Sequence, residues 1–143
     1  MVEIRPLSQE DLPQVAELLT LLDPLGGSVE ALLQAWRDLA ACPWGQAYVA
    51  VQEGRVVGTY TFYILPNLGH GGRSFAVMES VAVAQEVQGQ GIGTQMVRHA
   101  MEEARRAGAY KLVLSSALHR ERAHWFYQKL GFRVYGLALS TGL

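Results

Sequence analysis

The chain has 143 residues, 50% of them hydrophobic, and a formal net charge of −1 at pH 7. This length predicts a single domain over residues 1–143, and this composition argues against intrinsic disorder. A pI of about 6.4 argues against a dedicated nucleic-acid binder. The single cysteine excludes an internal disulfide, and no apolar run approaches the length of a membrane span. We therefore expect a cytoplasmic protein without a nucleic-acid or membrane partner.

The first third of the chain predicts one strand and two helices. Residues 2–6 alternate as a strand does, and a helix with a regular apolar face begins near Ser8. Residues 23–27, which include a proline and two glycines, are expected to end it. Ser28 is a candidate N-cap for a second helix that runs to about Ala41.

The middle third predicts three strands. Residues 46–52 and 55–65 are rich in β-branched and aromatic side chains, and Glu53-Gly54 between them is typical of a hairpin turn. Residues 66–72 form a glycine-rich loop, and residues 73–83 predict the next strand.

The last third predicts two helices and two strands. Apolar residues from Ile92 to Ala104 fall on one helical stripe. Residues 110–116 predict a strand that is apolar on both faces, which favours an internal position in the sheet. Residues 120–130 predict a helix, and residues 132–140 a final strand.

The expected order of elements is therefore β, α, α, β, β, β, α, β, α, β. Residues 73–116 form a βαβ unit, which predicts two parallel strands with a right-handed crossover. The hairpin before this unit adds antiparallel strands. The expected fold class is α/β, of the α+β kind, with helices on the faces of a mixed sheet.

The loop between the strand predicted at residues 73–83 and the helix after it carries glycine at three alternate positions, Gly89, Gly91 and Gly93. Glycines let an anion approach the backbone, and a helix N-terminus offers unpaired N–H groups and a favourable dipole. A Walker A loop would need a lysine before Thr94, and a Rossmann loop would need its third glycine one place later. The loop is therefore expected to hold the pyrophosphate of another nucleotide-like cofactor.

Two motifs in this order resemble the GCN5-related N-acetyltransferase (GNAT) family, which binds acetyl-CoA. The first is Gln88-Gly89-Gln90-Gly91-Ile92-Gly93, which matches Gln/Arg-x-x-Gly-x-Gly/Ala and follows a Val-x-Val strand end. The second is residues 123–132, a helix with Phe-Tyr and then Gly-Phe. The resemblance implies the acyl-CoA N-acyltransferase fold. It also implies direct transfer of an acetyl group from acetyl-CoA to a primary amine in a ternary complex, without a metal.

The sequence does not decide which amine accepts the acetyl group. Residues 78–83 and 109–115 are similar to the small-molecule amine branch, notably glucosamine-phosphate acetyltransferases, whereas residues 114–127 are similar to aminoalkylphosphonate acetyltransferases. We therefore expect a small-molecule amine. A protein or peptide N-acetyltransferase and a non-catalytic acetyl-CoA-binding module are the alternatives. Since exposed strands of this family often pair between copies, a homodimer is also expected.

The resemblance implies a cofactor site built from a strand end, the glycine loop and the later motif. A backbone N–H near Val81 would stabilise the oxyanion of the thioester. His119 stands where many relatives place a CoA-binding asparagine, so Ser115 or Ser116 is expected to replace it. The residues expected to bind acetyl-CoA are Val81, Ala82, Val83, Gln88, Gly89, Gln90, Gly91, Ile92, Gly93, Thr94, Ser116 and Tyr127.

Glu79 is the candidate base. By strict alternation it shares a face with Phe75, Val77, Val81 and Val83, where a carboxylate is costly unless it is partnered or lines a cleft. An amine with a pKa near ~10 arrives protonated, and a partly buried carboxylate could accept that proton directly or through water. A bulge between Glu79 and Val81, common in the family, would change the face. The alternative is a glutamate that only pairs with a lysine or arginine across the sheet.

Tyr127 is the family's usual general acid and would protonate the CoA thiolate, whose pKa is near ~8.5. The alternative is a core tyrosine. The residues expected to contact the acceptor are Glu79, His70 in the glycine-rich loop, Arg73 and His124, although each histidine could equally be an ordinary exposed one. The histidines and the cysteine show no metal-ligand spacing, so no metal is expected.

Overall fold

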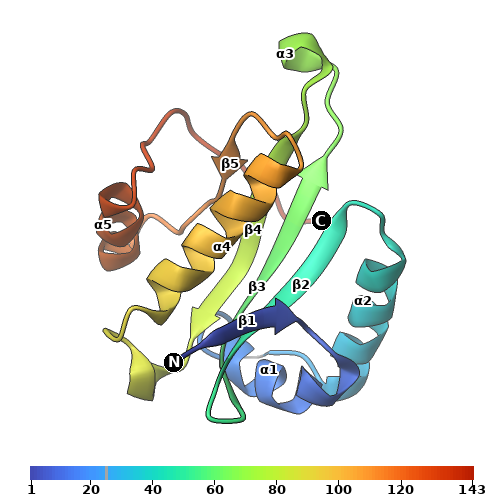
Figure 1. The fold of residues 1–143 in the computed structure, drawn as a ribbon, viewed down its shortest axis with the longest axis vertical. Coiled ribbons are helices and arrows are strands. Elements are labelled where there is room, and N and C mark those ends of the chain that lie inside the picture. Colours follow the sequence, from blue (N-terminus) through green and yellow to red (C-terminus); the bar gives the residue numbers. More distant parts are fainter. Residues whose placement is uncertain (25) are drawn as a thin grey trace. The chain divides into compact units, whose positions relative to one another are not determined.

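The computed structural model describes residues 1–24 and 26–143, which divide into two compact units, Met1–Val113 and Leu114–Leu143. Each unit is described by itself. The first contains a mixed five-stranded sheet in the order β1-β2-β3-β4-β5, with helices packed on it (Figure 1). This confirms the predicted α/β class with a mixed sheet. Within the described ranges, no helix is long and apolar enough to cross a membrane.

The first four strands pair consecutively and antiparallel, and the last pair is parallel. Glu53 and Gly54 both have positive φ, at 51° and 75°, as a tight hairpin turn with the twist of its strands requires. The predicted hairpin and the parallel βαβ unit are therefore confirmed. The strands are β1 (Glu3–Pro6), β2 (Gly45–Gln52), β3 (Arg55–Leu65), β4 (Phe75–Val83) and β5 (Leu112–Val113).

The second predicted helix begins where its cap predicts. Ser28 Oγ accepts a hydrogen bond from Ala31 N at 3.1 Å, which confirms it as an N-cap. The first helix ends earlier than residues 23–27, where we predicted its end, and residue 25 of that segment lies outside the described residues. The helices are α1 (Leu12–Leu19, after a 3-10 turn at Gln9–Asp11), α2 (Val29–Ala41), α3 (Gly69–Gly72), α4 (Ile92–Arg106) and α5 (Glu121–Lys129).

Helices α2 and α4 cover opposite faces of the sheet. A Cβ added to Gly45, which pairs with Tyr63, would lie 2.6 Å from Leu39 of α2. A Cβ added to Gly58 would lie 2.6 Å from Met96 of α4. Tyr63 and Gly58 both belong to β3, and odd and even positions of a strand point to opposite faces of the sheet. Helices α2 and α4 therefore lie on different faces. Both glycines therefore mark close helix-to-sheet approach.

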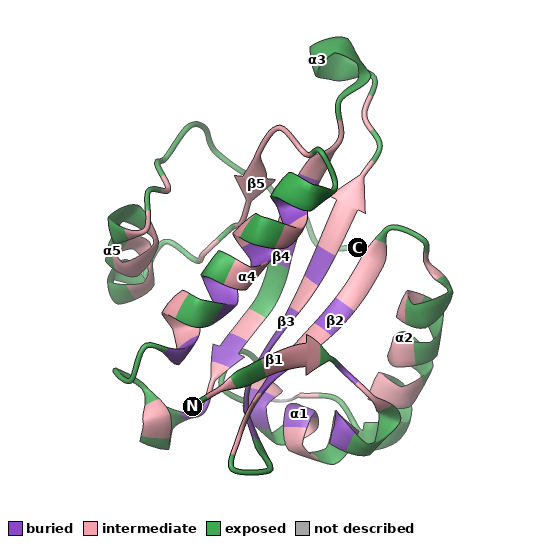
Figure 2. Ribbon diagram, in the orientation of Figure 1, coloured by how far each residue is buried: buried purple, intermediate pink, exposed green. Residues whose placement is uncertain are grey.

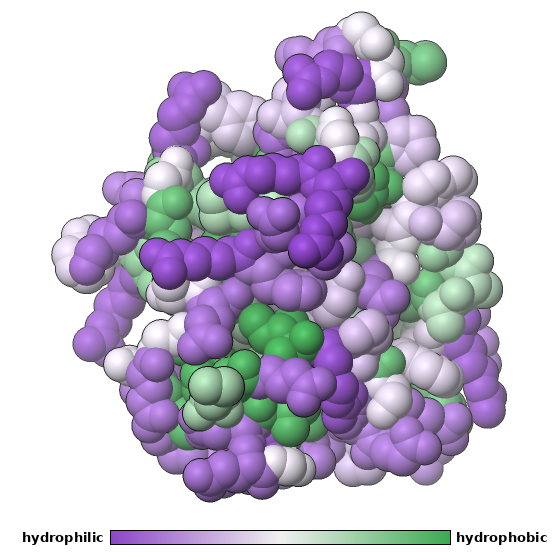
Figure 3. Space-filling view, viewed as in Figure 1, coloured by the Kyte–Doolittle hydropathy of each residue, from purple (hydrophilic) through white to green (hydrophobic). Residues whose placement is uncertain are grey.

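The face under α4 contains the largest fully buried side chains, among them Tyr60 and Met78 of the sheet and Met96 of the helix. Figure 2 shows this burial along the side of α4 that faces the strands. The outer side of α4 is strongly hydrophilic (Figure 3) and carries ion pairs between Glu102 and two arginines of the next turn. Helix α4 is thus amphipathic, as its sequence predicts.

The second unit contains α5 but no strand, so the predicted strand at residues 132–140 is wrong. The strand predicted at residues 110–116 shrinks to β5, which lies at the edge of the sheet and not inside it. An apolar pattern marks residues for burial but does not supply the neighbouring strand that β-pairing requires. Val134, Leu137 and Leu139 are accordingly 77%, 85% and 93% exposed.

Candidate active site

The glycine loop is fastened to the end of β4. Ala84 N donates to Val57 O of β3 at 2.8 Å, and a 3-10 turn, Gln85–Val87, follows. Gln88 Nε2 then donates to Val83 O at 3.1 Å. The side chain of Gln88 therefore ties the loop back to β4 and orients the backbone that follows.

The loop itself is an open cradle of backbone. Gly89 and Gly91 have φ of 87° and 84°, and a Cβ on either would meet no atom within 4 Å. Only glycine adopts this conformation without strain. Gly91 is the N-cap of α4, whose first N–H groups have no intrahelical partner. Open space, free N–H groups and the helix dipole fit a diphosphate.

A β-bulge interrupts β4 directly after Glu79. The pairing register with β3 shifts between Thr61, which faces Glu79, and Thr59, which faces Ala82. Ser80 adopts a φ of 52°, which is rare for a residue other than glycine. A bulge of this kind redirects the strand and its side chains. The bulge considered from the sequence is therefore present.

The bulge corrects the predicted surroundings of Glu79. Before it, Phe75, Val77 and Glu79 share a face as predicted. After it, Val83 faces Gly58 and lies on the opposite side of the sheet. Glu79 is exposed instead of partly buried, so the argument from a buried carboxylate is wrong. Its carboxylate stands at the surface, one residue before the bulge.

Along the edge of β4 that faces β5, most residues have no strand partner among the described residues. Strand β5 pairs with β4 only at Ala76 and Val77, so within the described residues no strand lies beside the later half of β4 on that side. This is where we predict that Val81 to Val83 line the cofactor. The part of β4 that leads to the glycine cradle thus has no strand partner on this side among the residues that the structure describes.

Tyr127 belongs to the second unit and Glu79 to the first, so their surroundings are described separately. The ring of Tyr127 lies 5.2 Å from that of Phe126 and 5.8 Å from that of Phe132, both edge-on. Burial raises the pKa of the Tyr127 phenol, and the charge of Arg120 opposes this only in part. At neutral pH the hydroxyl is therefore a proton donor.

Ser116 and His124 differ in how their polar atoms are satisfied. Ser116 Oγ is buried and has no hydrogen-bond partner among the residues that the structure describes. A buried hydroxyl of this kind calls for a partner, and a polar atom of CoA would supply one. His124 Nε2 lies 2.8 Å from Ala117 O, so this ring holds the turn before α5.

His70 and Arg73 lie in a group that the sequence did not reveal as a unit. The ring centroid of Tyr110 lies 4.5 Å from that of His70, 5.7 Å from Arg73 Cζ and 5.2 Å from Lys111 Nζ. We call His70, Arg73, Tyr110 and Lys111 the basic cluster. Tyr110 and Lys111 were missed as site residues, and their adjacency to a strand that pairs in parallel with β4 was the available signal. No group of three or more possible metal ligands occurs in residues 1–24 and 26–143.

Comparison with known proteins gives consistent matches over most of the chain. The model of the acetyltransferase (GNAT) family matches residues 12–132. The chain is 33% identical to an aminoalkylphosphonate N-acetyltransferase of Salmonella typhimurium, over 87% of this chain and 90% of that one. It is 27% identical to N-alpha-acetyltransferase 30 of Schizosaccharomyces pombe, over 94% and 86%. The crystal structure of a Trypanosoma brucei acetyltransferase superposes with a TM-score of 0.84 at 28% identity, covering 100% of both chains.

Proposed function

Since this chain belongs to the GNAT acetyltransferase family, we propose that it transfers the acetyl group of acetyl-CoA to a primary amine of a small molecule by direct attack. The open cradle at Gly89 and Gly91, which follows the end of β4, is the observation that carries this proposal. The name of the Salmonella typhimurium relative, an aminoalkylphosphonate N-acetyltransferase, supports a small acceptor.

The chain offers acetyl-CoA three kinds of contact. Backbone N–H groups of residues 88–94 would hold the diphosphate, the edge of residues 81–83 would pair with the pantetheine arm, and Ser116 Oγ would gain its missing partner. When bound, acetyl-CoA supplies the acetyl group as a reactive thioester. A backbone N–H near Val81, beside the bulge, is suited to stabilise the oxyanion that forms on the thioester carbonyl.

Two side chains would move the protons. Glu79, exposed at the bulge, accepts a proton from the ammonium group of the acceptor, directly or through water. The lone pair of the acceptor nitrogen then becomes available for attack. The nitrogen forms a bond to the acetyl carbon and releases its second proton to water, and the carbon–sulfur bond breaks. Tyr127, kept protonated by burial, gives its proton to the departing thiolate and regains one from water.

A second candidate acceptor is a peptide N-terminus. The exposure of Glu79 favours it, because the N-terminus of a peptide needs an accessible base. The Schizosaccharomyces pombe relative, named N-alpha-acetyltransferase 30, is compatible with this alternative. Both candidates use the same donor and the same chemistry.

The decisive experiment is an amine panel with acetyl-CoA, in which release of the CoA thiol is followed. Amino sugars, polyamines, aminophosphonates, amino acids and short peptides make up the panel. We expect turnover with at least one class. A Gly91→Val variant should raise the KM for acetyl-CoA at least about tenfold, since valine at this φ is strained and fills the cradle. Binding of acetyl-CoA without turnover on any amine would instead support a non-catalytic binding module.

We also propose that the protein forms a homodimer. The large apolar side chains of Val134, Leu137 and Leu139 are exposed, and contact with a second copy would bury them. Sedimentation velocity over a range of concentrations should show a dimer, and a monomer at all concentrations would refute it.

A further inference from the structure

Thr61 of β3 lies directly opposite Glu79 of β4 in the sheet. The two residues are partners in the antiparallel register, and the β-bulge follows immediately after them. Partners in such a pair project from the same face of the sheet, with Cβ atoms about 4.5–5.5 Å apart. The pairing therefore brings a hydroxyl group beside the carboxylate of the proposed base.

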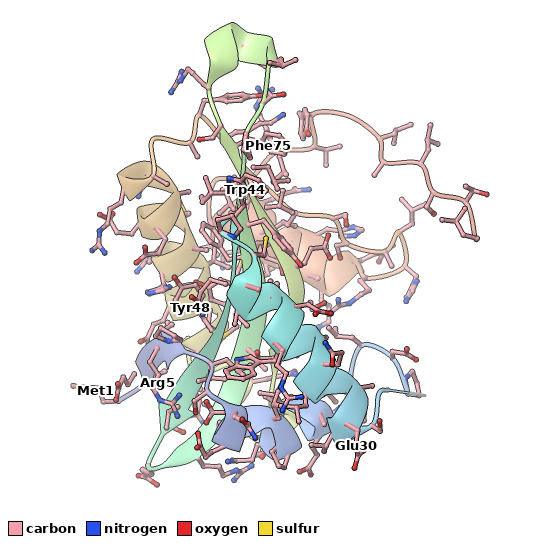
Figure 4. All side chains as sticks on the ribbon, turned by 90° about the vertical axis from the view of Figure 1, so that its right-hand side faces the viewer. Met1, Arg5, Glu30, Trp44, Tyr48 and Phe75 are labelled. Carbon is pink, nitrogen blue, oxygen red and sulfur yellow. The ribbon has the colours of Figure 1, made fainter. Side chains whose placement is uncertain are left out.

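The row of residues that crosses the sheet at this level runs from the interior of the protein to its surface. Ala47 of β2, which pairs with Thr61 on the other side, is 7% exposed. Thr61 is half-buried, and Glu79 is exposed. Figure 4 labels Trp44 and Tyr48, which precede and follow Ala47 in the chain, so the row lies at a level between them. Thr61 thus occupies the boundary between the packed interior and the exposed carboxylate.

The polar groups of Thr61 and Glu79 are complementary to an amine. Within the part of the chain that the structure describes, neither side chain forms a hydrogen bond or an ion pair with another residue. A hydroxyl group offers one donor and two acceptor positions, and a carboxylate offers acceptors only. An ammonium group has only N–H donors, so it can bind to both side chains at once.

Thr59, two residues earlier on the same face, shows how a threonine that serves the fold differs. It is 4% exposed, and its Oγ1 donates to Tyr48 O at 2.9 Å. Its neighbours across the sheet, Val49 and Ala82, are also buried, which closes this row to a ligand. The hydroxyl of Thr59 is therefore used within the protein, whereas that of Thr61 is available to a ligand.

The bulge gives the pair its place in the site. Two residues of β4, Ser80 and Val81, stand opposite a single residue of β3, so the strand bends directly after Glu79. The backbone N–H proposed to stabilise the oxyanion lies near Val81. An amine held between Thr61 and Glu79 is therefore within two residues, along the strand, of the backbone group that would bind the thioester carbonyl.

We propose that Thr61 is a second residue that binds the acceptor amine. Its Oγ1 accepts a hydrogen bond from one N–H of the ammonium group while the carboxylate of Glu79 accepts another. After the proton has passed to Glu79, Thr61 still holds a remaining N–H and keeps the nitrogen in place for its attack on the acetyl carbon. The inference rests on the proposed function and adds a residue to the acceptor site.

Thr61→Val tests the hydroxyl group, because valine has nearly the same shape and a high strand propensity. With the best amine of the panel, we expect kcat/KM to fall about tenfold through a higher KM for the amine, as loss of a hydrogen bond to a charged group predicts. The KM for acetyl-CoA should stay unchanged. Thr61→Ser keeps the hydroxyl group and should restore most of the loss.

Thr59→Val is the matched control, since it removes a hydroxyl group that is bonded within the protein. It should lower the urea midpoint and leave the KM for the amine unchanged. A wild-type KM for the amine in Thr61→Val, or a loss that Thr61→Ser does not restore, would overturn the inference.

A double-mutant cycle with Glu79→Gln tests whether the two side chains hold the same ammonium group. If they do, the loss in the double variant should be smaller than the product of the two single losses, by about threefold or more. Losses that multiply fully would refute the shared site. Turnover that Thr61→Val leaves intact refutes this inference alone, whereas no turnover of any amine by the wild type would refute the proposed function and this inference with it.

Discussion

At the residue scale, Tyr127 carries the clearest prediction for chemistry. Burial raises the pKa of its phenol, so it stays protonated through neutral and mildly alkaline pH. Tyr127→Phe should lower kcat about a hundredfold, the usual contribution of a general acid, with little change in the KM for acetyl-CoA. Steady-state kinetics would check this. Tyr63→Phe, at a half-buried tyrosine of β3, is the control and should retain wild-type kcat.

The wild-type pH profile bears on the same tyrosine. Because its folded-state pKa is raised, loss of the donor proton should begin only above pH ~10. An alkaline decline near pH 8 that disappears in Tyr127→Phe would contradict the assigned environment of this residue.

Glu79 should matter most when the acceptor amine arrives protonated. We expect Glu79→Gln to reduce kcat/KM by about tenfold to a hundredfold at pH 7, because the proton then has no carboxylate to receive it. The deficit should shrink toward pH 10, where the amine is already largely deprotonated. Paired pH–rate profiles measure this difference. A deficit that is the same at every pH would indicate that Glu79 binds the acceptor without accepting its proton.

At the same scale, Asp11 carries the clearest prediction for the stability of the fold. Its buried carboxylate accepts hydrogen bonds from Arg5 Nη1 and Nη2 at 2.7 and 2.9 Å and from Ser8 N at 2.8 Å. The hydrogen bond from Arg5 is the main cause of its lowered pKa. Asp11→Asn should therefore destabilise the fold by about 2 kcal/mol at neutral pH in urea unfolding.

The pH dependence of this contribution has a definite sign. A carboxylate with a lowered folded-state pKa stabilises the protein above its unfolded value, and the stability is lost as pH falls below about 4. The gap between wild type and Asp11→Asn should close in that range. Glu10→Gln, at the exposed neighbour, should leave the urea midpoint unchanged, and an equal loss there would contradict the assignment.

At the element scale, a polar contact fastens α4 to the sheet. Tyr60 Oη lies 2.6 Å from His99 Nδ1, and Tyr48 packs edge-on to the same imidazole at 4.7 Å. Burial raises the pKa of the Tyr60 phenol and lowers the pKa of the His99 imidazole. The carboxylate of Glu103, 3.8 Å from His99 Nε2, raises the pKa of His99 but offsets the effect of burial only in part. The phenol therefore donates to a neutral imidazole.

This contact predicts a stability that depends on pH. The folded state binds fewer protons at His99 than the unfolded state does, so its contribution is present above about pH 6.5 and declines as pH falls below that value. The urea midpoint of the wild type should fall between pH 7.5 and pH 5.5. The fall should be smaller in His99→Gln and unchanged in the control His119→Gln, at an exposed histidine. Identical slopes for all three proteins would refute a role for His99.

The elements also show how far sequence reasoning reaches. Local chemistry predicts β3, the hairpin at Glu53-Gly54 and the cap at Ser28, because propensity and turn geometry act over a few residues. The change of face after Glu79 could not be predicted from alternation, since a single left-handed residue at Ser80 places Val83 on the other side of the sheet. The predicted strand at residues 132–140 failed because strand formation depends on a partner that periodicity cannot identify.

At the scale of the whole molecule, the glycine cradle and the strand edge could be predicted, whereas the basic cluster could not. The cradle is a contiguous motif, so its spacing is visible in the chain. The cluster brings together the β3–β4 connection and the start of β5, which only the parallel pairing of β4 with β5 makes adjacent. The donor motif is thus visible in the sequence, whereas the basic cluster is visible only in the tertiary structure.

The measurement that tests direct transfer most plainly is the two-substrate initial-velocity pattern, with acetyl-CoA and an amine from the panel varied together. Attack by the amine on the bound thioester in a ternary complex predicts lines that intersect in the double-reciprocal plot. It also predicts that acetyl-CoA alone leaves no acetyl group on the protein, as judged by intact mass. Parallel lines, with an acetylated protein in the absence of amine, would contradict the account.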